Sequence, residues 1–110
     1  MPKFITIGYG DLEGYNRTET SVRETAHAYD AELIKKGALM GIAGSPVQVR
    51  NHDAAQVVTK EGSYMDSILP IAGFAVIEAT NMAEAVKMVS QVPCAVAQGV
   101  VEVWPLEPTT

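Results

Sequence analysis

Three stretches of the chain have the apolar pattern of β-strands. Residues 3–9 place Ile5, Ile7 and Tyr9 in alternation with their neighbours, so both faces of this strand can be covered. Residues 71–79 give the strongest strand signal, and residues 98–104 predict a closing strand. Shorter candidates lie at 38–42, 46–50 and 55–59.

Two further stretches have helical periodicity. Between residues 18 and 36, one apolar stripe at helical spacing predicts a helix packed on a core. The stripe consists of Val22, Ala26, Tyr29 and Leu33. Two pairs match a capping box at its start, Asn16 with Glu19 and Ser21 with Glu24, and Gly37 is a natural stop.

The second helix opens at Asn81, because Glu84 three residues later completes a capping box. Ala83, Val86 and Val89 give it an apolar face, and Pro93 lies just past its expected end. Residues 60–70 predict a loop, and Pro105 begins a short tail.

The order of these elements is β-α-β-β-(β)-β-α-β, with no linker to divide residues 1–110 into two domains. Two β-α-β halves predict an α+β fold of the ferredoxin-like, split βαβ kind. Two helices cover only one face of a four- or five-stranded sheet. We therefore expect a second copy of the chain to cover the other face, as a homodimer or higher homo-oligomer.

Charge and cysteine content narrow the expected partners. The formal net charge is −5, and the basic residues are scattered apart from the pair Lys35-Lys36. Nucleic acid and anionic membrane surfaces are therefore not expected partners, since both select basic patches. A single cysteine, Cys94, excludes an internal disulfide. With no signal-peptide pattern and no apolar run of roughly 20 residues, these features predict a cytoplasmic protein.

Several segments carry a more specific pattern. They are FITIGYGD at the start, VQVR before a polar turn, AGFAVIEATNMAEAVKMVSQVP, and the closing GVVEVWPL. Together they resemble the YCII-related family, in its DGPF-motif branch. In residues 61–66 this chain has Glu-Gly-Ser-Tyr-Met-Asp where the family has Asp-Gly-Pro-Phe-Ala-Glu, and Trp104 stands where arginine is usual. The resemblance implies a dimeric α+β barrel in which sheets from two subunits face each other.

The first candidate site lies on the predicted helix at 18–36. Arg23, His27, Asp30 and Ile34 form a second row beside the apolar stripe. Asp30 is close enough to orient the His27 imidazole, which suits a general base near neutral pH. The resemblance points to the same residues, since relatives place a histidine shortly after an arginine on this helix, and a His/Asp pair is proposed to act in relatives linked to degradation of chlorinated aromatics. The alternative is a solvated shoulder of an amphipathic helix.

Other candidates are weaker. Tyr9 and Asp11 end the first strand and could share a cleft with His27. Tyr64 and Asp66 stand in the loop that replaces the family motif, where the alternative is a hairpin loop at the oligomer edge. The turn at residues 50–53, with His52 and Asp53, is an ordinary turn composition.

No spacing of histidine and cysteine predicts a metal site, and no nucleotide-binding motif is present, so no cofactor is expected. Two functions stay open. In the first, His27 and Asp30 are the catalytic pair of a cofactor-free lyase or isomerase, with Tyr9, Asp11, Arg23, Tyr64 and Asp66 binding a small polar or aromatic substrate. In the second, the chain is a non-enzymatic ligand-binding or oligomeric accessory protein.

Overall fold

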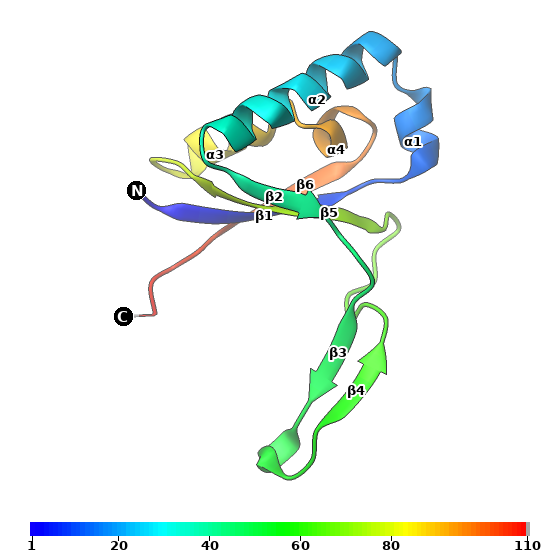
Figure 1. Ribbon diagram of the computed structural model, residues 1–110, viewed down its shortest axis with the longest axis vertical. Helices are drawn as coiled ribbons and strands as arrows, with labels where there is room; N and C mark the ends of the chain where they lie inside the picture. The colour runs from blue at the N-terminus through cyan, green and yellow to red at the C-terminus, as the bar shows by residue number, and fades with distance from the viewer. Residues whose placement is uncertain (110) are drawn as a thin grey trace.

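The computed structural model describes residues 1–109, which form a four-stranded antiparallel sheet with helices on one side and a separate projecting hairpin (Figure 1). The order of the strands in the sheet is β2-β5-β1-β6. Their bounds are β1 Lys3–Tyr9, β2 Leu39–Ile42, β5 Ile71–Glu78 and β6 Val100–Pro105. The structure confirms the mixed α+β class, and each of these strands lies within two residues of its predicted range.

The register of the central pair separates the two faces of the sheet. Phe4 of β1 lies opposite Ile77 of β5, and both are buried beneath the helices. The alternate positions Ile5 and Val76 are also paired and point to the opposite face. A bulge between Gly8 and Tyr9 shifts the register at the end of β1.

The helices gather on one face of the sheet (Figure 1). They are α1 Leu12–Arg17, α2 Thr20–Lys35, α3 Met82–Val89 and α4 Pro93–Val96. The core between α3 and the sheet consists of Phe4, Ile77, Ala79, Ala85 and Val89. Of the predicted stripe on α2, Ala26 and Leu33 are buried, whereas Val22 is exposed.

The end of α2 follows its sequence signal. Gly37 has a φ of 107°, the left-handed conformation that glycine adopts without strain. The amides of Gly37 and Ala38 donate to the carbonyls of Ile34 and Leu33, both at 3.0 Å, which is the Schellman arrangement. The predicted stop at Gly37 is therefore confirmed.

The start of α2 does not follow its sequence signal, and both capping boxes predicted there are wrong. The N-cap residue is Glu19, and its side chain makes no capping hydrogen bond. The reason is that Asn16 belongs to α1, a helix that the sequence pattern did not predict, and that Ser21 lies inside α2. Asp11 caps this helix by accepting from the amide of Gly14 at 2.8 Å, and the Thr18 hydroxyl donates to the Gly14 carbonyl.

The start of α3 is confirmed. The Asn81 side chain accepts from the amide of Glu84 at 2.9 Å, and the Glu84 carboxylate accepts from the amide of Thr80 at 2.9 Å. Pro93 does not simply follow this helix. It occupies the first turn of α4, where its fixed φ suits a helix start.

A two-stranded hairpin, which we call the arm, projects away from the sheet (Figure 1). It consists of β3 Val47–Arg50, the short helix η1 His52–Ala54 and β4 Val58–Glu61. The radius of gyration is 16.0 Å, whereas a compact chain of this length has about 13 Å. The projecting arm explains the excess.

The strand predicted at 55–59 is displaced. β4 begins at Val58, opposite Arg50, because the turn that precedes it is long. Asp53 and Ala54 have φ values of 58° and 57°, so the chain reverses through a left-handed pair before it can pair again. The predicted loop at 60–70 accordingly loses Lys60 and Glu61 to the strand.

None of the helices within residues 1–109 has both the length and the apolar character that crossing a bilayer requires.

Candidate active site

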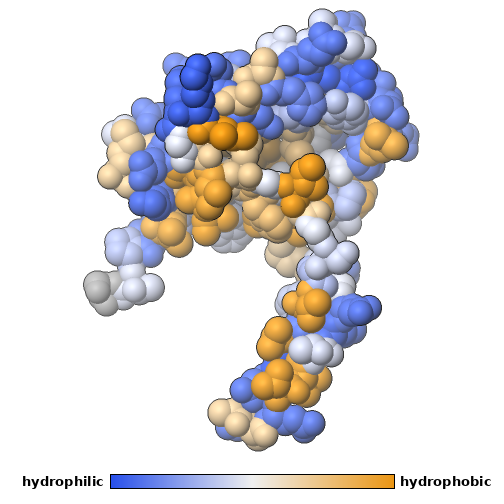
Figure 2. Space-filling model, viewed as in Figure 1, coloured by the Kyte–Doolittle hydropathy of each residue, from blue (hydrophilic) through white to orange (hydrophobic). Residues whose placement is uncertain are grey.

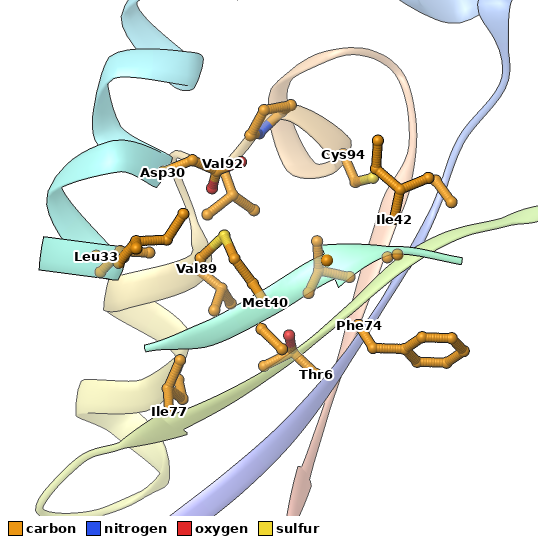
Figure 3. A pocket seen from close by; sticks show the side chains of 18 of the residues that line it. Thr6, Asp30, Leu33, Met40, Ile42, Phe74, Ile77, Val89, Val92 and Cys94 are labelled. Atoms are coloured by element: carbon orange, nitrogen blue, oxygen red, sulfur yellow. The ribbon is translucent and has the colours of Figure 1, made fainter. Parts of the chain in front are cut away.

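A cavity of about 420 Å³ lies between the sheet and the helices α2 and α4 (Figure 3). Its walls are mostly apolar, and Met40 from the edge strand β2 stands near its middle. The main apolar wall residues are Leu33, Ile42, Ile77, Val89 and Val92. The polar or titratable residues among those that line it are Thr6, His27, Asp30 and Cys94.

Glycines let the floor of this cavity form. A β-carbon on Gly8 would stand 2.8 Å from the Cys94 sulfur, so the glycine allows α4 to sit directly on β1. A β-carbon on Gly73 would stand 2.7 Å from the Gly41 carbonyl oxygen. Both glycines line the cavity, and a side chain at either position would force a neighbouring element to shift.

His27 is held by a residue that the sequence analysis did not single out. The Tyr15 hydroxyl and the His27 Nε2 atom are 2.8 Å apart, within hydrogen-bond distance. The expected orientation of His27 by Asp30 is not found, since Tyr15 is the hydrogen-bond partner recorded for His27 within residues 1–109. Tyr15 could not have been identified from the sequence pattern, because it reaches His27 only through the unpredicted helix α1.

Arg23 contacts Tyr15, the partner of His27, and does not line the cavity. Its guanidinium lies 4.7 Å from the centre of the Tyr15 ring, a cation–π contact, and it donates to the Thr20 hydroxyl at 3.0 Å. Arg23 is not among the residues that line the cavity. Tyr15 of α1 thus contacts both Arg23 and His27 of α2.

Among the residues that line the cavity, Asp30 and Cys94 have shifted pKa values. Burial raises the pKa of the Asp30 carboxyl, and the nearby His27 opposes this shift. Burial also raises the pKa of the Cys94 thiol, with a further contribution from Asp30. A carboxyl with a raised pKa is suited to exchanging protons nearer neutral pH, whereas a thiol with a raised pKa stays protonated and is a poor nucleophile.

Tyr9 and Asp11, expected to share a cleft with His27, have other partners. The Tyr9 hydroxyl donates to the Glu102 carboxylate at 2.6 Å across the β1–β6 pair, and Asp11 caps α1. Neither residue is among those that line the cavity. The structure therefore brings His27 and Asp30 together at one cavity without Tyr9 or Asp11.

Tyr64 and Asp66 follow β4 and belong to the base of the arm. Tyr64 helps to line a separate hollow of about 460 Å³, and the Arg50 guanidinium lies 5.8 Å from the centre of its ring. Neither Tyr64 nor Asp66 lines the cavity beneath α2. His52 lies in η1, at the far end of the arm.

Across residues 1–109, no group of three or more histidine, cysteine, aspartate or glutamate side chains is placed to hold a metal ion.

No family model matches this chain, and no curated protein matches it. The resemblance to the YCII-related family therefore stays a prediction.

Proposed function

We propose that the cavity beneath α2 binds a small organic molecule, largely apolar with one polar group, and that Asp30 and His27 move a proton on it without a cofactor. The observation that carries this proposal is the presence of a half-buried carboxyl with a raised pKa at a mostly apolar cavity. The volume of about 420 Å³ is within the range of small-molecule sites. Perturbed titratable groups in such a cavity favour a functional site over a structural one.

The reaction class that fits is a lyase or isomerase. The Asp30 carboxylate would take a proton from an acidic C–H bond of the bound molecule. The carboxylic acid would then return the proton at a second carbon, or deliver it to a leaving group. His27, fixed by Tyr15, would hydrogen-bond the polar group of the ligand at the cavity mouth.

A second candidate is a non-enzymatic binding module. One observation favours it: no lysine or arginine is among the residues that line the cavity, and Arg23 of α2 is engaged by Tyr15 and Thr20. The residues that line the cavity therefore include no permanently charged cation for an enolate or other developing anion. Stabilisation of such a charge is usually the largest contribution to this kind of catalysis.

We also propose the ferredoxin-like arrangement and a YCII-like homodimer built on the face of the sheet opposite the helices. The strand order β2-β5-β1-β6 in an all-antiparallel sheet supports the first. Exposed Leu39, Phe74 and Trp104 on that face support the second, because a second sheet packed there would bury them.

The enzymatic proposal is tested with 2-tetralone, a neutral aromatic ketone with acidic C–H bonds. In D₂O, proton NMR should show its α-protons being replaced by deuterium faster with protein than in buffer. Asp30→Asn should lower this rate by about 10²–10⁴, and His27→Ala should lower it less. His52→Ala is the matched control, since this second histidine lies on the arm and should leave the rate unchanged.

Two negative outcomes have different meanings. Saturable binding of 2-tetralone without accelerated exchange would contradict catalysis and favour the binding module. Absence of binding, followed on the backbone amides of Gly8 and Gly73, would contradict both candidates.

A further inference from the structure

The side chains that line the cavity beneath α2 include an acidic residue without a lysine or arginine to balance it. Asp30 is the one carboxyl among the residues that line it, and no lysine or arginine is among them. Arg23 points to Tyr15 and Thr20, while Lys35 and Lys36 are exposed at the end of α2 and do not line the cavity. A bound anion would therefore meet Asp30 without a neutralising lysine or arginine at the cavity wall.

The backbone does not reverse this imbalance. The carboxyl end of α3 reaches the cavity at Val89 and carries partial negative charge. The amino end of α4 reaches it at Pro93 and carries partial positive charge. These two short helix ends carry partial charges of opposite sign, whereas an ionised Asp30 carries a full negative charge at the cavity wall.

We infer that the cavity selects its ligands by charge: it takes apolar amines and neutral alcohols, phenols or ketones, and it excludes carboxylates of the same size. This inference rests on the proposed binding function and narrows its ligand class. Two carboxylates in one apolar site repel each other, and neither keeps the hydration that it has in water. An ammonium group instead pairs with Asp30, while a neutral group can accept from or donate to it.

The test uses three probes that share one ring system: tryptamine as the cation, 3-methylindole as the neutral molecule and indole-3-acetate as the anion. Binding is measured by NMR titration at about pH 8, where histidine side chains in general carry little charge. Tryptamine should bind at least as tightly as 3-methylindole, and indole-3-acetate should bind at least about tenfold more weakly than 3-methylindole.

Asp30→Asn separates charge from shape, because the amide keeps the size of the carboxyl. In this variant the three affinities should converge to within about threefold. Asp66→Asn is the matched control, since it removes one carboxylate from the base of the arm and should leave the order of the three probes unchanged.

The outcomes distinguish the two proposals. If indole-3-acetate binds as tightly as 3-methylindole, or if Asp30→Asn leaves the order unchanged, charge selection is wrong and the binding function stands. If none of the three probes shifts the amides of Gly8 and Gly73, the binding function fails, and charge selection fails with it.

Discussion

On the face of the sheet that the helices cover, Phe4 and Ile77 are 4% and 2% exposed, whereas Phe74 and Trp104 on the opposite face keep 48% and 55% of their surface exposed. All four are large apolar residues in neighbouring strands, so local sequence does not distinguish them. The difference arises because α2, α3 and α4 all pack on one side. An apolar sheet face without helices is typical of an interaction surface.

The arm is a second region where apolar side chains are exposed rather than buried. Valines at positions 47, 49, 57 and 58 are exposed, and the space-filling view shows apolar surface along the arm as well as at the level of the sheet (Figure 2). A two-stranded hairpin is marginally stable alone in water. Within residues 1–109, the arm and the uncovered sheet face are thus two apolar surfaces that no other element covers.

Of the substitutions considered, Ile77→Ala on the covered face should destabilise the fold most. This substitution removes a fully buried side chain from the core beside Phe4 and Val89, and should lower the free energy of unfolding by about 2–5 kcal/mol. Urea denaturation measures it. A loss below about 1 kcal/mol would mean that the core relaxes around the cavity or that Ile77 is not buried.

A substitution on the uncovered face should weaken association between copies more than it destabilises the fold. If two copies pack through it, Trp104→Ala should weaken association by about 2 kcal/mol or more, the size of an interface hot spot, and change the unfolding of the monomer much less. Sedimentation over a range of protein concentrations separates these effects. A wild-type chain that stays monomeric at micromolar concentration would contradict the proposed dimer.

The sequence predicted the ends of helices correctly where a local residue pattern leaves the backbone few alternatives. Gly37 ended α2 as predicted, and Asn81 with Glu84 began α3, since both signals act within one turn of helix. The central strands followed from their apolar pattern. The arm was predicted as two strands, but the start of β4 depended on the left-handed pair Asp53 and Ala54, and neither residue is a glycine that would mark such a turn.

The candidate site was accessible to sequence reasoning only in part. The spacing of His27 and Asp30 put both on one side of α2, and both line the cavity. The partner of His27 was missed, because Tyr15 lies on a six-residue helix that has no apolar periodicity to predict it. Tyr9 and Asp11 were expected at the cavity because they end the first predicted strand. That position does not reveal that Glu102 and Gly14 engage them.

A smaller effect is expected at the start of α3, which supports the covered face. Asn81→Ala removes the acceptor for the Glu84 amide and should cost about 0.5–2 kcal/mol in equilibrium denaturation. The matched control is Asn51→Ala on the arm, where the asparagine side chain makes no capping hydrogen bond. Equal losses for the two variants would show that the cap at Asn81 contributes nothing specific.

The smallest effect concerns Asp30, at the cavity on the covered face. Its pKa is raised in the folded chain by burial, so the folded state holds the proton more tightly than the unfolded state does. The favourable contribution is therefore complete below the ordinary value of 3.8 and is lost as the pH rises through the raised pKa. Asp30→Asn should remove this loss, so the stability of the variant relative to wild type should increase from acidic to neutral pH.

Denaturation at a series of pH values between about 3 and 8 measures this slope, which we expect to be modest because solvent screens a half-buried carboxyl. Asn81→Ala removes no titrating group and serves as the control, since its stability should differ from wild type by the same amount at every pH. A relative stability of Asp30→Asn that stays constant, or that falls as the pH rises, would mean that the carboxyl is not desolvated. Asp30 would then be a solvated residue on the shoulder of α2, and the covered face would have lost its proposed proton-transfer group.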